Sequence, residues 1–378
     1  MTWELTRLAQ RDTALDTLRA TPQNRSAPSR APHSSAVDLA ARLGCALGMQ
    51  RALVTGGLGF LGSAIVRSLR QREVAVRVLA LPNEPTDNLE GEAYELVRGD
   101  VLDLEACRTA MDGVDTLFHC AALYKAFMPD PRRMYEVNLR GTFNMLEAAR
   151  RAGVTRTVYT ASIVSIGRPP KGRLADESTP YEAWDVDMPY SRSKYHSREV
   201  AESFASWGMD VRIVCPGAVF GPGDIAPTPS GKIIINTLKQ RGPAVYTAGG
   251  TSYVDVRDAA EVHVLAATRG RAGERYIATA HNLDNGELMR AILDAAGDRR
   301  ALRRLPSGLV RHLVRGMERA ALRRGAEPPV ASNFYEFSLT PGFYSNEKSR
   351  LELGASYRPL GETLRDALDY FRARGLLR

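Results

Sequence analysis

Cysteine is scarce in this chain, and long apolar runs are absent. Only four cysteines occur among 378 residues; they are widely separated and form no C-x-x-C pair. This pattern predicts neither a zinc site nor a disulfide framework, so we expect no metal and a reducing, cytoplasmic compartment. No stretch of about 18 apolar residues occurs, so no membrane-spanning helix is expected. The composition, 44 % hydrophobic and 25 % charged, is that of a folded globular protein.

Acidic residues are nearly missing from one segment, 299–324, which holds nine arginines and one acid, Glu318. The chain has 51 Lys and Arg against 43 Asp and Glu, and this segment alone accounts for the net charge of +8. The rest of the sequence is neutral, and it shows no zinc-finger spacing and no RNA-recognition aromatic motif. We therefore expect no nucleic-acid partner.

The arginine-rich segment predicts a helix over 307–324 with a basic ridge. Arg311, Arg315, Arg319 and Arg323 recur at steps of four, with apolar residues between them. One interpretation is a solvated helix face packed on a lobe of the protein. The other is a peripheral membrane contact with anionic lipid, or a contact with an acidic partner, near the substrate entrance.

Residues 1–48 differ in composition from the rest of the chain. The stretch 21–37 is rich in Pro, Ser and Ala and has no acid, which predicts a flexible N-terminal extension. We interpret it as a dispensable tail, or as sequence ahead of a true start at Met49. It is similar to a transit peptide only loosely, and a secretory signal is not expected.

From Arg51 to Pro216, short apolar strands alternate with helices. This order predicts an α/β fold with a Rossmann-type, doubly wound parallel sheet covered on both faces. Residues 49–216, with returns from the C-terminal part, would form the dinucleotide-binding domain, and 217–378 mainly a smaller C-terminal substrate-binding lobe. The expected strands are 51–55, 74–79, 94–98, 115–119, 155–160 and 211–215, with short ones near 245 and 276; the expected helices are 59–70, 104–111, 132–151, 190–206, 231–241, 258–268, 285–296 and 307–324.

A glycine-rich loop, T-G-G-L-G-F-L-G, links the first strand to the first helix. Gly56 would permit a tight turn, Gly59 would let the backbone approach a pyrophosphate, and Gly62 would let the helix pack on the strand. The helix N-terminus, at Phe60 and Leu61, would then face the phosphates with its free amides and its positive dipole end. The loop in this context predicts a dinucleotide cofactor.

The tip of the second strand indicates which dinucleotide binds, because an acid there binds a ribose diol and a base accepts a 2′-phosphate. No Lys or Arg occurs over 78–97, and Glu84 could reach the diol. NAD is therefore favoured over NADP. After the third strand, Asp100 and Val101 are expected beside the adenine, although Asp100 could also be a plain loop acid.

Tyr190 and Lys194 open a long helix at i,i+4 spacing, which places both side chains on one face. A cation beside a phenol lowers the phenol's pKa, which suits Tyr190 to proton transfer near neutral pH. Ser162 follows the fifth strand, where it could hold a substrate oxygen against Tyr190. Lys194 could also bind a nicotinamide ribose.

Together these motifs resemble the extended short-chain dehydrogenase/reductase family, over roughly residues 49–378. Within it, stretches 123–131, 175–177 and 224–232 are most similar to the dihydroflavonol-reductase-like and hopanoid-associated sugar epimerase group. The other shared motifs are G-D-V at 99–101, H-C-A-A at 119–122, V-N-L-R-G-T at 137–142, C-P-G at 215–217 and Y-V-D-V-R-D at 253–258.

The resemblance implies roles for individual residues. Ser162 would polarise the substrate oxygen, Tyr190 would be the general acid/base, and Lys194 would lower its pKa and bind the ribose. Asn138 would support the site. Ala121 and Pro216 would contact the cofactor, His119 would be structural, and helices 132–151 and 190–206 would form a homodimer.

Three functions fit these residues. The first is hydride transfer between nicotinamide and a carbonyl or secondary alcohol of a small, partly apolar substrate. The second is epimerisation of a sugar or nucleotide-sugar at the same site. The third is a non-catalytic dinucleotide-binding regulator, a class that typically loses the Tyr or the Lys. For hydride transfer, the expected substrate pocket would be lined by Tyr124, Phe127, Met128, Tyr181 and Trp184. The alternative is that these residues only pack a lid over the site.

Two departures from family patterns favour hydride transfer. Ile163–Val164 stand where sugar-nucleotide dehydratases carry an acidic pair. Thr251–Ser252 stand where epimerases usually carry an arginine that clamps a diphosphate, although Lys232, Lys239 or Arg241 could substitute.

Overall fold

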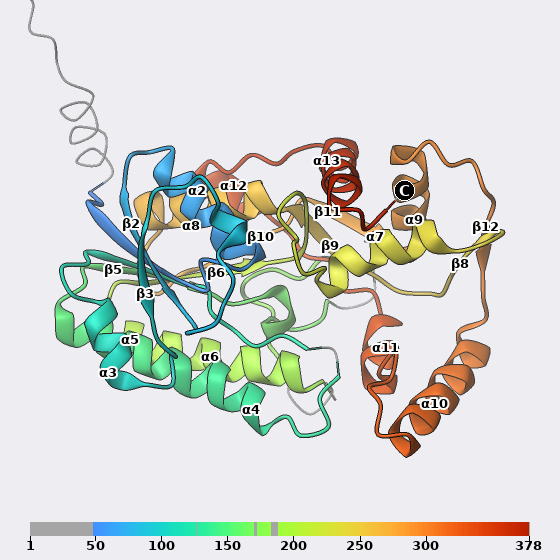
Figure 1. Cartoon of the computed structure of the whole chain (residues 1–378), viewed down its shortest axis with the longest axis horizontal. Helices are drawn as coiled ribbons and strands as arrows, with labels where there is room; N and C mark the ends of the chain where they lie inside the picture. The colour runs from blue at the N-terminus through green and yellow to red at the C-terminus, as the bar shows by residue number, and fades with distance from the viewer. Residues whose placement is uncertain (1–47, 126, 170–171, 183–187, 378) are drawn as a thin grey trace, which may run out of the picture.

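The computed structural model describes residues 48–125, 127–169, 172–182 and 188–377 (Figure 1). The predicted N-terminal extension, apart from Gly48, and Trp184 lie outside these residues. No helix in the described part of the chain is both long enough and apolar enough to span a bilayer.

A seven-stranded sheet forms the centre of the molecule. Its order is β10-β6-β5-β4-β1-β2-β3, and every neighbouring pair is parallel. The chain winds outward from β1 in both directions, so the predicted doubly wound fold is confirmed. The strands are β1 (Arg51–Thr55), β2 (Ala75–Ala80), β3 (Glu95–Arg98), β4 (Thr116–His119), β5 (Arg156–Thr160), β6 (Val211–Pro216) and β10 (Arg275–Ala278).

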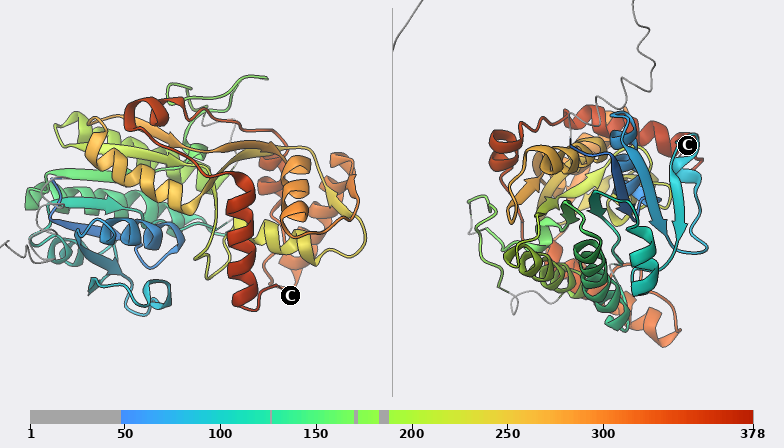
Figure 2. Two further views of the ribbon diagram at one scale, coloured as in Figure 1. Left: turned by 90° about the horizontal axis from the view of Figure 1, so that it is seen from above. Right: turned by 90° about the vertical axis from the view of Figure 1, so that its left-hand side faces the viewer.

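Helices cover both faces of this sheet (Figure 1; Figure 2). Successive strand residues point to opposite faces. Val54 therefore packs in one core cluster with Ile65 and Val262, whereas Leu53 packs in another with Met145. One layer holds α2 (Phe60–Arg70), α8 (Val256–Arg269) and α12 (Glu347–Leu353); the other holds α3 (Leu104–Ala110), α5 (Gly141–Ala152) and α6 (Pro189–Ser206).

The helix predicted over 132–151 is interrupted. It consists of α4 (Arg132–Tyr135), a π-helical turn over Glu136–Arg140, and α5. The wide turn contains Asn138, whose side chain is bound to a neighbouring loop and to α6, and such turns often occur at functional sites. No local sequence pattern signals the break, because the contacts that accompany it are long-range.

The smaller lobe has its own core, formed by Phe220, Ile234, Leu288 and Leu364 with their neighbours. The chain beyond residue 216 also returns α8, β10 and α12 to the large sheet. The lobe comprises β7 (Ala218–Phe220), α7 (Pro229–Lys239), β8 (Ala244–Tyr246), β9 (Gly250–Asp255), β11 (His281–Asp284), α9 (Asn285–Ala295), β12 (Leu302–Arg304), α10 (Ser307–Arg323), α11 (Ser332–Ser338) and α13 (Leu360–Ala373).

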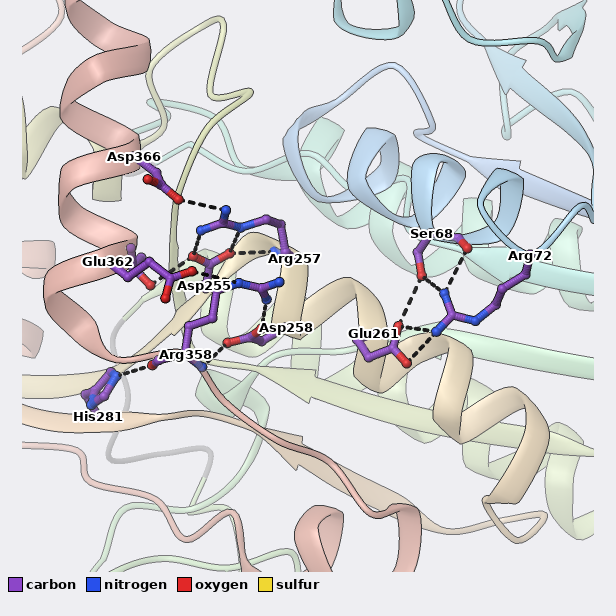
Figure 3. A network of polar contacts seen from close by, with 11 residues as sticks. Ser68, Arg72, Asp255, Arg257, Asp258, Glu261, His281, Arg358, Glu362 and Asp366 are labelled. Carbon is purple, nitrogen blue, oxygen red and sulfur yellow. Dashed lines mark hydrogen bonds and ion pairs between the residues drawn. The ribbon is translucent and has the colours of Figure 1, made fainter.

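A polar network joins α13, the lobe's last helix, to the start of α8, which covers the large sheet (Figure 3). Asp255 caps α8 by accepting from the Arg257 amide, and Arg257 also pairs with Asp366 of α13 at 2.7 Å. Arg358, just before α13, binds the carboxylate of Asp258. The Y-V-D-V-R-D motif is therefore explained by capping and ion pairing that attach the C-terminal segment.

Candidate active site

One continuous cavity, of about 1110 Å³, runs from the glycine-rich loop, past the carboxyl edge of the sheet, to α10 and α11. Open α/β sheets bind ligands at this edge. The cavity brings together the residues that the sequence identifies as candidate cofactor and catalytic residues, except Asn138. The cavity is lined by Gly56, Gly59, Phe60, Leu61, Gly62, Asp100, Val101, Ala121, Ser162, Tyr190, Lys194 and Pro216.

The glycine-rich loop leaves room that any side chain would fill. Gly56 has a φ of +66°, and a Cβ there would lie 3.0 Å from the backbone of Ala121. A Cβ on Gly62 would overlap the Gly56 carbonyl. The N-terminus of α2 follows, with no side-chain cap and no acid in its first turn. Its free amides suit a pyrophosphate, so the residues present fit a dinucleotide.

At the tip of β2, the structure differs from the sequence-based prediction in one respect. Arg98, one residue beyond the stretch without bases, reaches back to this tip and donates to the carbonyls of Leu81 and Glu84 at 2.7 and 2.8 Å. The Glu84 carboxylate accepts from the Leu81 amide at 3.2 Å and lines the cavity. An acid and a base therefore both lie near the expected 2′ position.

Both carboxylate oxygens of Asp100 have partners. One carboxylate oxygen accepts from the Leu102 amide at 2.9 Å, and the other lies 3.2 Å from Arg133. Arg133 also lines the cavity, although sequence reasoning did not identify it. Its partner Asp100 lies far along the chain, so the sequence offered no local signal.

Ser162, Tyr190 and Lys194 meet at the carboxyl ends of β5 and β6. Ser162 begins a short 3₁₀ turn over Ile163–Ser165, and its hydroxyl accepts from the Val164 amide at 3.4 Å. The ring of Tyr190 packs against that of Tyr124, with centroids 4.2 Å apart. The buried ammonium of Lys194 donates to the Thr160 carbonyl at 2.7 Å.

The pKa of Tyr190 is shifted in the direction opposite to the expected one. Burial raises it, repulsion from Tyr124 and Tyr159 adds to the rise, and a hydrogen bond with Ser162 lowers it slightly. The amine of Lys194 donates to the Thr160 carbonyl and to the Tyr159 hydroxyl. Tyr190 therefore holds its proton at neutral pH.

Asn138 does not line the cavity but binds groups in its wall. Its amide oxygen accepts from the Leu123 amide at 2.7 Å, and its nitrogen donates to the Leu123 carbonyl and to the Ser193 hydroxyl. Ser193 in turn donates to the Tyr190 carbonyl at 2.8 Å. Asn138 thus positions the start of α6 and the Leu123 loop.

Two buried histidines support the same wall. His119 lies between the hydroxyls of Thr55 and Thr142, and burial lowers its pKa to about 3. His263, which sequence reasoning missed, lies 2.9 Å from the Thr160 hydroxyl, and burial lowers its pKa to about 4. Both rings are neutral at physiological pH, so each is a hydrogen-bonded structural group.

The far half of the cavity is largely apolar. Tyr124 lines it as predicted, but Phe127, Met128 and Tyr181 do not; the Tyr181 ring instead stacks on Tyr195 at 4.2 Å. Sequence reasoning did not assign α10 and α11 to the pocket. The apolar lining from this part of the lobe includes Met289, Val310, Val314, Met317, Val330 and Phe334.

Comparison with known proteins identifies related sequences and folds. The model of the "NAD dependent epimerase/dehydratase family" matches residues 52–278. The chain is 33 % identical to "Putative dihydroflavonol 4-reductase" of Synechocystis, over 86 % of this chain and 95 % of that protein. It is also 33 % identical to "3 beta-hydroxysteroid dehydrogenase/Delta 5-->4-isomerase" of Mycobacterium tuberculosis, over 85 % of this chain and 90 % of that protein.

Solved structures share the fold. The crystal structure of gox2253 has a TM-score of 0.77 and 35 % identity, covering 87 % of this chain and all of that one. A nucleoside-diphosphate-sugar epimerase from Pseudomonas aeruginosa has a TM-score of 0.71 and 26 % identity, covering 87 % of this chain and 99 % of that one.

Proposed function

The chain belongs to the NAD dependent epimerase/dehydratase family, and we propose that it is an oxidoreductase that transfers a hydride between NAD and a carbonyl or secondary alcohol of a small, partly apolar substrate. The observation that carries the proposal is the cavity. One end is a glycine-rich dinucleotide cradle, the middle holds Ser162, Tyr190 and Lys194, and the other end is apolar. A substrate that carries a carbonyl group on an apolar body would fit this arrangement, with the carbonyl at the catalytic residues and the body in the apolar end.

The residues divide the chemistry between them. The nicotinamide cofactor, when bound, supplies or accepts the hydride. Ser162 donates a hydrogen bond to the carbonyl oxygen, and Tyr190, which holds its proton, transfers it to that oxygen as the C–O double bond is reduced. Lys194 supplies a buried positive charge to the same cavity wall, where it would favour the developing negative charge and bind the cofactor ribose.

We favour NAD because Glu84 lines the cavity at the tip of β2, whereas Arg98 is bound to two carbonyls there. A 2′-phosphate would have to compete with those bonds. Titration of the protein with NADH and NADPH, followed by nicotinamide fluorescence, tests this choice. Tighter binding of NADPH would contradict it.

Epimerisation of a nucleotide-sugar is less well supported. Thr251 lines the cavity where an epimerase usually carries its clamping arginine, and Lys232, Lys239 and Arg241 are not among the described lining residues. A diphosphate would therefore find none of these three cations in the cavity wall. The regulator alternative is disfavoured because both Tyr190 and Lys194 are present and face the cavity.

The decisive experiment is cofactor consumption by the Tyr190→Phe variant. We expect NADH oxidation with a panel of ketones and aldehydes to fall by about 10²- to 10⁴-fold, because the proton donor is lost. Tyr195→Phe, on the same helix but outside the cavity, is the matched control. Equal turnover by wild type and Tyr190→Phe would contradict the enzyme proposal. Turnover of sugars without net NADH loss would favour epimerisation.

We also propose the membrane contact, in a narrower form than the sequence suggested. Arg311 and Arg315 share one counter-ion, Glu336 of α11, at 2.6 and 3.3 Å, so the pair keeps a net positive charge. On the same helix, Leu309 and Leu313 are 56 % and 55 % exposed. Apolar residues beside arginines suit the surface of an anionic bilayer. Co-sedimentation with anionic and neutral vesicles tests the idea, and equal binding to both, or no binding, would overturn it.

We further propose a homodimer through α5 and α6. Phe143 of α5 is 46 % exposed and Trp207, just after α6, is 67 % exposed, and both rings pack on Phe204. Such an apolar patch suits a self-complementary interface. Sedimentation of wild type and Phe143→Asp is the test, and a wild-type monomer would refute it. A cytoplasmic location is proposed because the three cysteines within the described residues, Cys107, Cys120 and Cys215, are free thiols.

A further inference from the structure

Arg168 stands out in the wall of the cavity. It follows β5 by eight residues, and its partly buried guanidinium lies over the ring of Phe337, 4.1 Å from the centroid. One of its amino groups donates to the Phe337 carbonyl at 2.7 Å. No Asp or Glu of the described residues lies within ion-pair distance of it. Burial lowers its pKa, as is usual for a cation that loses water without gaining an anion.

The position of Arg168 is fixed by close backbone packing. A Cβ on the preceding residue, Gly167, would overlap the carbonyl of Pro180, so glycine allows the two loops to touch. The Gly167 amide donates to the Thr179 carbonyl at 3.3 Å. The same short segment begins at Ser162, and both Ser162 and Arg168 line the cavity. The chain thus holds a cation in the pocket that contains the catalytic residues.

The other two cations among the described residues of the cavity wall already have assigned places. Arg133 pairs with Asp100 at 3.2 Å, and Lys194, which donates to the Thr160 carbonyl at 2.7 Å, belongs to the proposed catalytic group. Arg168, in contrast, makes one hydrogen bond within the described part of the chain, to the Phe337 carbonyl, and its guanidinium lies against the Phe337 ring of α11. A charge in an apolar wall is costly unless a partner compensates it.

We propose that Arg168 recognises a carboxylate on an otherwise apolar substrate. This inference rests on the proposed oxidoreductase function and names the substrate class of the same site. A planar guanidinium matches a carboxylate through two parallel hydrogen bonds, and its single positive charge balances a monoanion. A phosphate, which carries more charge, would call for further free cations in this half of the cavity. The substrate is thus an oxo or hydroxy acid whose apolar body lies along α10 and α11.

The test compares hydroxy acids with their methyl esters, which keep the shape and lose the charge. The probes are 3-hydroxydodecanoate and 12-hydroxystearate, which separate the alcohol from the carboxylate by different lengths. Binding in the presence of NAD⁺ is measured by thermal shift, and oxidation by NADH formation. For the acid whose length fits, we expect wild type to favour the acid over its ester by about 10- to 100-fold.

Variants separate recognition from a structural role. Arg168→Met is expected to lower binding of the acid to that of the ester and to leave the ester unchanged. Phe337→Leu removes the aromatic contact but keeps the charge, so it should preserve the acid preference. Equal binding of acid and ester by wild type, a failure of both acids to bind, or an equal loss for both forms in Arg168→Met would overturn the inference. Acid-selective binding without any oxidation would support Arg168 and contradict the proposed function.

Discussion

The two ends of the cavity are built differently. The cofactor end is made largely of backbone, as at Gly62, and is supported from behind by buried polar groups with fixed partners, such as His119 and Asn138. The substrate end is made of apolar side chains from α10 and α11, and Val314 is the one residue of α10 that is buried. The difference suggests that the chemistry is set by a tightly packed frame, whereas substrate choice is set by a surface that changes with few consequences for folding.

The sharpest test of this contrast places one methyl group at each end. Gly62→Ala is expected to abolish NADH binding and lower Tm, because the Cβ overlaps the Gly56 carbonyl. The matched control is Gly316→Ala on α10, where a Cβ meets nothing within 4 Å. That control should raise stability by about 0.5–1 kcal/mol, since alanine favours a helix. NADH fluorescence and thermal melts give both readouts; normal NADH binding by Gly62→Ala would refute the tight cradle.

Loss of the buried ammonium is expected to have the next largest effect. Lys194→Met keeps the length of the side chain but removes the charge from the cavity wall that also holds Tyr190. We expect kcat/KM to fall by about 10²- to 10³-fold, without loss of the fold. Lys232→Met, an exposed residue of the lobe, should leave kcat/KM unchanged. A small effect of Lys194→Met would show that Tyr190 acts without it.

The sequence predicts the features that depend on local signals and misses those that depend on long-range contacts. The alternation of strands and helices in a parallel sheet and the glycine-rich loop were predictable, because strand and helix periodicity and the special backbone of Gly56 are local signals. The π-helical turn at Asn138 was not, since it accompanies contacts with Leu123 and Ser193. Periodicity also could not show that Val314 faces a cavity.

The pKa of Tyr190 shows a further limit. Its spacing from Lys194 suggested a lowered pKa, but spacing on a helix says nothing about depth, and burial raises the pKa instead. Arg98 was missed for a simpler reason. It lies just beyond the stretch in which a base was sought, and β3 pairs with β2 so that it reaches the tip.

Acid is expected to weaken the cofactor end first. His119 and His263 are buried as neutral rings, with pKa values lowered to about 3 and about 4. Each stabilises the fold fully above the unfolded pKa near 6.5 and loses that contribution as pH falls toward its folded value. At pH 5 the loss is about 2 kcal/mol for each ring. Urea unfolding at pH 7.5 and 5 measures it, and His119→Asn should show a smaller difference between the two pH values than wild type.

The smallest expected effect distinguishes two neighbouring residues of α10. Val314 is buried and lines the cavity, whereas Leu313 is 55 % exposed. Val314→Ser should lower kcat/KM for long apolar substrates by about 10-fold, because a polar group replaces a contact with the substrate. Leu313→Ser should leave kcat/KM unchanged in solution and weaken binding to anionic vesicles. If both variants lowered kcat/KM equally, α10 would act only through its own stability, and the substrate end would not be the separable surface that the structure indicates.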